Sequence, residues 1–183
     1  MIDPADFNGN FGHKPVPELL RDLVLFENGL PSRDHYARGF ELLPATGQSL
    51  LRTYSEDETF LDTLTEFAQA DGTGSMYVLW HKSETENPVA VFGSEGGFHI
   101  VARNLSELLE ILVFDTEPVV DWDGVTYFKT DPGETSLYSS AFRGWVSGRL
   151  AGIHPALPDQ VVRHARERYG AEFAAWMSLY CHP

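Results

Sequence analysis

The residues with the most obvious chemical potential lie at positions 93–97, where the sequence reads GSEGG. A glycine-rich loop can hold a phosphate when it runs from a strand directly into a helix, because the helix N-terminus then faces the anion. A serine at the centre of G-x-S-x-G can act as a nucleophile at a similar turn. Here the serine is in the second position, and residues 98–102 (FHIVA) form another strand-like run instead of a helix. We therefore predict a β-hairpin turn with Glu95 at its tip.

Metal coordination is not indicated by the seven histidines or by the single cysteine. No H-x-x-x-H or H-E-x-x-H string occurs, and one cysteine cannot form a thiolate cluster. His81 and Glu84 could place two ligands together, but they lie where a strand is expected to become a loop, and we interpret them as surface residues. Residues 121–124 (DWDG) resemble the beginning of a calcium loop but lack its third acidic position and its later glutamate. We expect no metal and no cofactor.

Nucleophilic and acid–base catalysis are not indicated either. Cys181 and His182 are adjacent, but they lie at the end of the chain, where fixed catalytic geometry is not expected. Carboxylates are so numerous that proximity in the sequence identifies no acid–base pair. We expect no catalytic residues; an enzyme would require a deep pocket lined by ionisable groups with shifted pKa values.

The charge of the chain is strongly acidic and is concentrated in its middle. The chain carries 13 basic and 27 acidic residues, a formal net charge of −14. Residues 56–134 hold three basic and seventeen acidic residues, whereas residues 1–55 have a net charge of −2 and residues 135–183 a net charge of +2. Such a field repels phosphate backbones and anionic membranes, so direct nucleic-acid or membrane binding is not expected. It attracts a basic protein, although acidic residues can also serve solubility alone.

The length of 183 residues and the hydrophobic fraction of 43% indicate one globular domain with a core of its own. Cys181 has no partner for an internal disulfide, which suits a reducing compartment. No basic-then-apolar leader is present, and no apolar run is long enough to span a bilayer. We expect a cytoplasmic protein.

The first part of the chain is predicted to contain two helices. Residues 1–14 are rich in residues that break regular structure, and we expect a loosely attached arm. Pro17 suits the first turn of a helix that ends at Asn28. Ser55 begins an S-E-D-E string that is typical of a helix N-terminus, and apolar residues then recur at helical spacing. We expect this second helix to continue to the turn at Asp71.

The middle of the chain changes to strands, and its end is predicted to be helical. The expected central strands are apolar on both alternating faces. The expected helices begin at cap-like residues or at proline, and Asp-Gly marks a hairpin turn. In order, we expect strands at 75–82, 88–92 and 98–102, a helix after Asn104, a hairpin over 119–128, a helix within 135–150, and a last helix from Pro158 towards Tyr180 in which Gly170 marks a break.

The four tryptophans lie in segments that are expected to be regular, with Trp80 and Trp122 on strands and Trp145 and Trp176 on helices. We interpret all four as packing residues. A tryptophan that is exposed beside acidic residues would instead be a candidate anchor for a partner, because buried aromatic residues dominate the binding energy of interfaces.

About half of the chain carries a family resemblance. Its segments are LLRDLVLFENGLP (19–31), FAQADGTGSMYVLW (67–80), PVAVFGSEGGFHIVA (88–102) and NLSELLEIL (104–112). In the order and texture of their elements they resemble the SUKH superfamily, which contains fungal cell-wall-synthesis regulators and many bacterial toxin-immunity proteins. The residues after the leucine-rich helix do not obviously match.

The resemblance implies an α+β fold in which a single, mostly antiparallel sheet is packed by helices. We expect residues 1–183 to form one SUKH-like domain, with residues 135–183 as a helical C-terminal elaboration. The resemblance also implies binding without a chemical reaction, because bacterial members of this kind neutralise a toxin, often a nuclease, that a competing cell delivers.

We therefore expect a non-enzymatic immunity protein that binds a basic toxin domain. The first alternative is a regulatory or scaffold module of the same fold that binds a host protein, and the second is an unrecognised enzyme. Acidic side chains at an expected helix start and in expected turns would attract the partner, on the assumption that they share one face. These candidates are Glu56, Asp57, Glu58, Glu84, Glu86 and Glu95.

Overall fold

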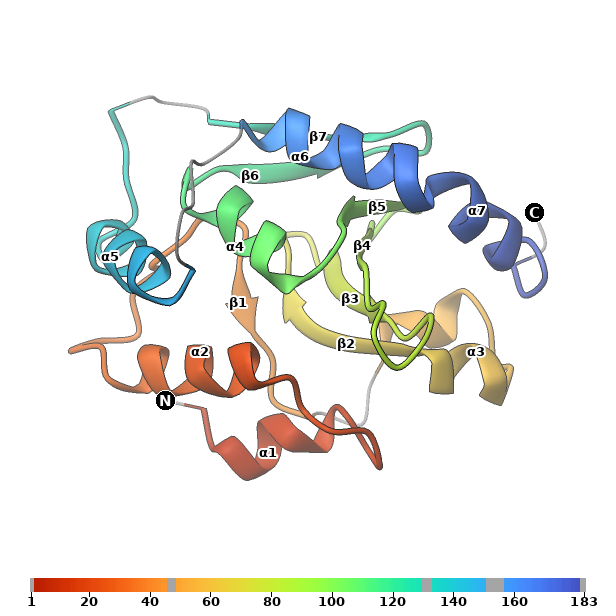
Figure 1. Ribbon diagram of the computed structural model, residues 1–183, viewed down its shortest axis with the longest axis horizontal. Coiled ribbons are helices and arrows are strands. Elements are labelled where there is room, and N and C mark those ends of the chain that lie inside the picture. Colours follow the sequence, from red (N-terminus) through yellow and green to blue (C-terminus); the bar gives the residue numbers. More distant parts are fainter. Residues whose placement is uncertain (1, 46–48, 130–132, 151–156, 182–183) are drawn as a thin grey trace.

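The computed structural model of the protein describes residues 2–45, 49–129, 133–150 and 157–181. It shows an α+β fold in which a five-stranded antiparallel sheet lies between helices (Figure 1), as expected. The strand order is β1-β2-β3-β4-β5, so each strand pairs with its neighbour in the sequence. A two-stranded sheet, β6-β7, lies beyond β5 (Figure 1).

The strands are short, and the helices have between one and three turns. The strands are β1 (Glu41–Leu42), β2 (Leu64–Gln69), β3 (Met76–Trp80), β4 (Val89–Phe92), β5 (Phe98–Ala102), β6 (Glu117–Val120) and β7 (Val125–Phe128). The helices are α1 (Pro4–Gly9), α2 (Glu18–Asn28), α3 (Glu58–Thr63), α4 (Leu105–Leu112), α5 (Ser139–Arg149), α6 (Pro158–Ala165) and α7 (Ala171–Met177), with a 3₁₀ turn at Leu50–Thr53 and a π-helical turn at Arg166–Gly170.

The large sheet is buried on both faces because alternate residues of its central strands enter two different cores. In β3, Tyr77 and Leu79 belong to a first core that includes residues of α1, α2, α4 and α5. Val78 and Trp80 belong to a second core that includes residues of α3 and α7. The continuous apolar runs over 75–82 and 88–92 therefore mark central strands, as predicted.

The glycine-rich segment 93–97 is a hairpin turn between β4 and β5, as predicted. The Gly93 amide donates a hydrogen bond to the Gly97 carbonyl oxygen over 2.9 Å and closes the turn. Gly96 and Gly97 have φ angles of +110° and +80°, which residues with a side chain rarely adopt. Glu95 is exposed at the tip.

The predicted helix between Ser55 and Asp71 is wrong over its second half. Helix α3 ends at Thr63, and the chain continues directly as strand β2. The apolar residues over 60–68 do not share one face of a helix. Leu64 enters the second core with α3, whereas Phe67 enters the first core on the opposite face of the sheet. A bulge between Glu66 and Ala68 shifts the strand register there, which gives a strand the spacing of a helix.

The predicted loose arm at residues 1–14 is also wrong. Asp3 caps α1 by accepting a hydrogen bond from the Ala5 amide, and Phe7 and Phe11 are fully buried in the first core. Phe7 lies on α1 and Phe11 lies in the turn that follows it, with the centres of their rings 5.8 Å apart. The two buried phenylalanines together attach this segment to the core. The glycine and asparagine residues between and around the two phenylalanines made the sequence resemble an irregular segment.

The π-helical turn and α7 cover the second face of the sheet, whereas α5 and the start of α6 contribute to the first core. Helix α6, the π-helical turn and α7 run without interruption, so Gly170 ends a π-helical turn and does not break the helix. Helix α5 lies within residues 135–150, as predicted, whereas residues 151–156 lie outside the described part of the chain. None of the described helices is long and apolar enough to cross a membrane.

Candidate protein-binding surface

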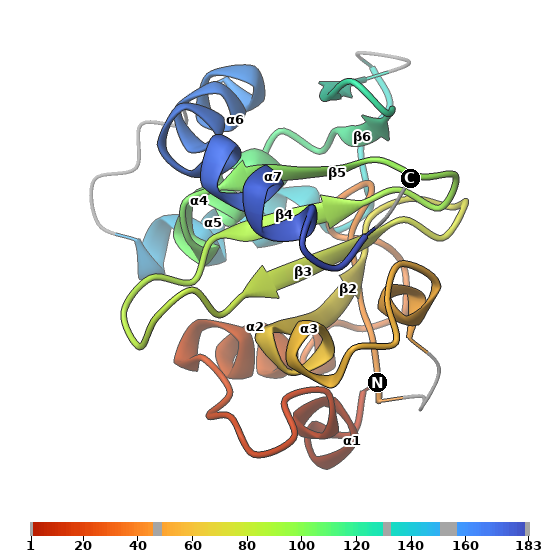
Figure 2. The same ribbon diagram turned by 90° about the vertical axis from the view of Figure 1, so that its right-hand side faces the viewer.

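The six acidic residues that the sequence singles out are not brought together on one face. The loops at residues 83–87 and 93–97 precede and follow β4, so Glu84 and Glu95 lie at opposite ends of the sheet (Figure 2). Both side chains are exposed. The two turns therefore do not form one cluster, although all of these charges contribute to the long-range field.

Two of the six carboxylates have a structural role. Glu86 pairs with Lys82 over 2.9 Å and with Arg168 over 3.3 Å, and it accepts a hydrogen bond from the Tyr169 hydroxyl over 2.9 Å. The hydrogen bond from Lys82, followed by that from Tyr169, lowers the pKa of Glu86.

Asp57 is the second, because it caps α3. Its carboxylate accepts hydrogen bonds from the Thr59 and Phe60 amides. Glu56 and Glu58 beside it are exposed. The sequence prediction found the right string for the start of this helix, but the cap is Asp57 and not Ser55.

The β6-β7 hairpin presents exposed apolar side chains, which the sequence did not predict. Pairing of Val119 with Thr126 and of Glu117 with Phe128 places these four side chains on one face, which is the outer face because their neighbours Pro118 and Tyr127 are buried. Val119 and Phe128 remain exposed there.

Trp122 at the hairpin turn is 76% exposed, so its interpretation as a packing residue is wrong. It lies between Asp121 and Asp123, which are also exposed. The Asp121 amide donates to the Gly124 carbonyl oxygen over 2.9 Å, which leaves Trp122 and Asp123 as the two residues of the turn itself. The prediction failed because the alternating flanking residues indicated that Trp122 lies on a strand. A residue in the turn lies on neither face of the hairpin.

The hairpin turn is held against the glycine turn at residues 93–97. A Cβ atom on Gly96 would lie 2.3 Å from the six-membered ring of Trp122, so the ring packs directly on the glycine backbone. His99 Nε2 donates a hydrogen bond to the Asp121 carbonyl oxygen over 2.7 Å. Burial lowers the pKa of His99, which favours its neutral form. The tryptophan is thus exposed but positioned by a rigid support.

We call the outer face and the turn of this hairpin the hairpin surface. It consists of exposed apolar groups with carboxylates at its edge, and Glu95 lies next to it in the glycine turn. Arg166 also approaches the hairpin, near Gly124. The residues of the hairpin surface are Glu117, Val119, Asp121, Trp122, Asp123, Thr126 and Phe128.

Replacement of Gly96 by alanine is expected to destabilise the protein by about 1–3 kcal/mol, because a φ angle of +110° is strained for a residue with a side chain. The new Cβ atom would also push the exposed Trp122 ring away from the glycine turn. Urea unfolding measures this change, and the fluorescence of the folded protein should report displacement of the indole. Gly72→Ala is the control, since nothing lies within 4 Å of its Cβ position. Equal stability of the two variants would contradict the packing described here.

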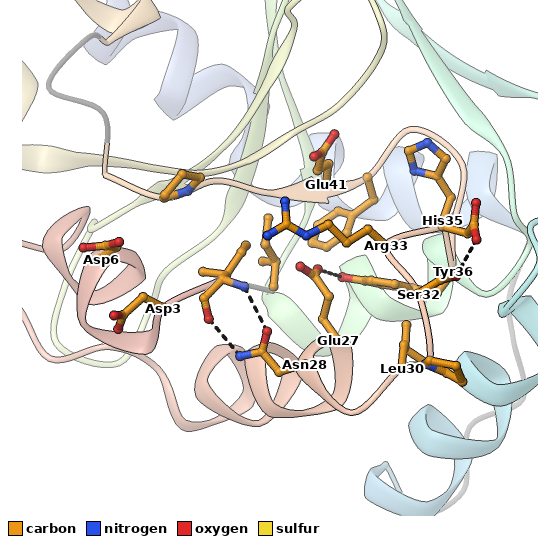
Figure 3. Close-up of a pocket in the computed structure, with 16 residues that line it drawn as sticks. Asp3, Asp6, Glu27, Asn28, Leu30, Ser32, Arg33, His35, Tyr36 and Glu41 are labelled. Carbon is orange, nitrogen blue, oxygen red and sulfur yellow. Dashed lines mark hydrogen bonds between the residues drawn. The ribbon is translucent and has the colours of Figure 1, made fainter.

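A second feature is a pocket of about 570 Å³ between α1, α2 and the loop that leads to β1 (Figure 3). Burial raises the pKa of Glu27, and the Tyr36 hydroxyl donates a hydrogen bond to its carboxylate over 3.2 Å. Figure 3 shows the guanidinium of Arg33 pointing into the pocket between Glu27 and Glu41. A raised carboxyl pKa suits a general acid, so this pocket is where the enzyme alternative would be tested first.

The other groups considered from the sequence do not form a site in the described residues. His81 donates or accepts hydrogen bonds with Thr65 and Asn87, as expected for a structural histidine. Within the described ranges, no three potential ligands are grouped for a metal ion. His182, which follows Cys181, lies outside the described residues.

Comparisons of the chain with protein-family models, with curated proteins and with solved structures gave no match. The resemblance to the SUKH superfamily therefore stays a prediction.

Proposed function

We propose that this protein is a non-enzymatic binding protein, and that it acts as an immunity protein that neutralises a basic toxin domain. The observation that supports this proposal is Trp122, a large aromatic side chain exposed on a supported turn between two carboxylates. A tryptophan in this setting is costly to leave in water, and Trp is among the residues that contribute most to interfaces.

In this proposal the acidic groups and the apolar side chains of the hairpin surface have separate roles. Acidic residues at both ends of the sheet create a long-range field that attracts a basic protein and speeds its association. The hairpin surface then supplies apolar contact area, which determines how slowly the complex dissociates. The dispersed candidates, such as Glu84 and Glu58, belong to the first role.

The family resemblance supports the same proposal, and the immunity role within it rests on that resemblance. Helix α2, strands β3, β4 and β5 and helix α4 occur in the order of the resembling segments. One segment departs from the expected pattern, because residues 64–69 before the D-G-x-G turn form a strand and not a helix. The proposal of a toxin partner rests on this resemblance, whereas the proposal of a basic partner rests on charge.

The proposal is tested by calorimetric binding to the C-terminal domain encoded by the adjacent gene, at low and at high salt. We expect tight binding that weakens as salt screens the acidic field. Tight binding that is indifferent to salt would retain immunity but reject the steering role of the charges. No binding at either salt concentration would contradict the proposal and favour the regulatory alternative, which a pull-down from the host cell would then examine.

A further inference from the structure

The carboxylates of the hairpin surface have no cationic partner in the described part of the chain. Ion pairs there engage Lys82, Arg103 and Arg149 with other carboxylates, but none involves Asp121 or Asp123. The hairpin therefore combines an exposed indole with two negative charges that are free to pair with a cation from outside the chain.

Elsewhere in the fold, the same combination of groups holds an arginine. The guanidinium of Arg149 lies 5.2 Å from the centre of the Trp145 ring and pairs with Asp22. In a second instance, Arg168 lies 4.9 Å from the ring of Tyr169 and pairs with Glu86 over 3.3 Å. A cation over an aromatic face is attracted by the ring quadrupole, and tryptophan gives the strongest such attraction. An adjacent carboxylate adds a charge-assisted hydrogen bond.

The turn at Trp122 offers these groups without an arginine. No cation lies over the Trp122 ring among the described residues, and Arg166 near Gly124 forms neither a cation–π contact nor an ion pair there. We propose that an arginine side chain of the partner occupies this position, over the Trp122 ring and in contact with Asp121 or Asp123. This inference rests on the proposed function, because it names the partner chemistry that the hairpin surface recognises.

Arginine suits this position better than lysine for two reasons. Its planar guanidinium can stack on the indole while its edge donates to a carboxylate, whereas an ammonium group is a compact charge that stays hydrated. Apolar side chains next to that arginine in the partner would then contact Val119 and Phe128 on the outer face of the hairpin. The expected partner segment therefore contains an arginine with apolar side chains next to it.

The first test is an NMR titration of the free protein with N-acetyl-arginine methylamide, observed at the four indole N–H signals. Trp122→Phe identifies the signal of Trp122. We expect this signal to shift saturably with the arginine derivative, more weakly with the lysine derivative, and not with the uncharged citrulline derivative. Buried Trp80 is the internal reference, whose signal should stay unchanged. No shift, or equal shifts with arginine and citrulline, would overturn the inference.

The second test repeats the calorimetry on the neighbour-encoded domain with matched variants. Trp122→Ala is expected to weaken binding about 10- to 30-fold, and Asp121→Asn with Asp123→Asn about 10-fold. Glu56→Gln with Glu58→Gln removes the same charge elsewhere and should weaken binding less than about threefold. If the hairpin variants bind like the wild type, this inference fails while the proposed function stands. If the wild type itself does not bind, the proposed function fails.

Discussion

Replacement of Phe173 by alanine is expected to lower the free energy of unfolding by about 3–5 kcal/mol. Phe173 is 2% exposed and lies at the centre of the second core. Its ring centre lies 5.1 Å from that of Trp80, and it meets Phe92 and Phe98 edge-on at 6.2 Å and 6.0 Å. Loss of the ring would leave a cavity against the sheet, and edge-on aromatic contacts would be lost in addition to the buried area.

The measurement is urea unfolding followed by far-UV circular dichroism, with Phe128→Ala as the matched control. That substitution removes the same atoms from a side chain that is 47% exposed, so we expect a loss of less than about 1 kcal/mol. A loss in Phe173→Ala as small as the one expected for the control would show that the C-terminal helix contributes little to the second core.

Replacement of Asp115 by asparagine is expected to cost about 2–4 kcal/mol at neutral pH. Asp115 is 3% exposed and follows α4 with a φ angle of +56°. Its carboxylate accepts hydrogen bonds from the Arg38 amide over 2.8 Å and from the amide and hydroxyl of Ser136, and it lies 4.0 Å from Lys129. Three hydrogen-bond donors and one ammonium group thus face one carboxylate, and an asparagine amide would turn a donor towards at least one of them.

The pH dependence of stability distinguishes the contribution of the Asp115 charge from that of its size and packing. Backbone strain is not altered, since asparagine also tolerates positive φ. Burial alone would raise the pKa of Asp115, but the hydrogen bonds from Ser136 and Arg38 and the charge of Lys129 outweigh burial and lower it from 3.8. The folded protein therefore binds this proton less readily than the unfolded chain. The contribution is complete above the unfolded pKa and is lost as pH falls through the folded pKa.

We therefore expect the stability difference between wild type and Asp115→Asn to be constant above about pH 5 and to shrink in acid. Urea unfolding of both proteins from pH 3 to pH 7 measures it. Asp123→Asn, at an exposed position, is the control and should follow the wild type within about 0.5 kcal/mol. A difference that does not change with pH would mean that lost packing, and not the charge, causes the effect.

The fold class was predictable because strands and helices in most of the chain have distinct periods. The runs 75–82, 88–92 and 98–102 and the cap at Asn104 are local signals, and the structure confirms them. Residues 64–69 were not predictable in this way, because a bulge and burial on two faces imitate the spacing of a helix. Only pairing with β3, across the turn at residues 70–75, distinguishes the two.

The candidate site was predictable in its charge but not in its location. Net charge is additive along the chain, whereas a shared surface depends on which turns the sheet places at the same end. The sequence contained one usable signal, the Asp123-Gly124 pair that predicts a hairpin turn. The structure places the turn one residue earlier, on Trp122 and Asp123, where an aromatic residue has no core to enter. The contact between Trp122 and Gly96 was not predictable, because the two turns lie far apart in the sequence.

The position of α7 has a consequence for how the protein is made. The aromatic face of the sheet is complete once Phe98 has been synthesised, but its cover waits for Phe173. At about 5–20 residues per second, that face is open to the cell for on the order of ten seconds on every nascent chain. During this interval the exposed rings are a site for chaperone capture or for association between neighbouring chains on one messenger RNA. Synthesis of α7 therefore determines when the aromatic face of each new molecule is covered and can no longer take part in aggregation.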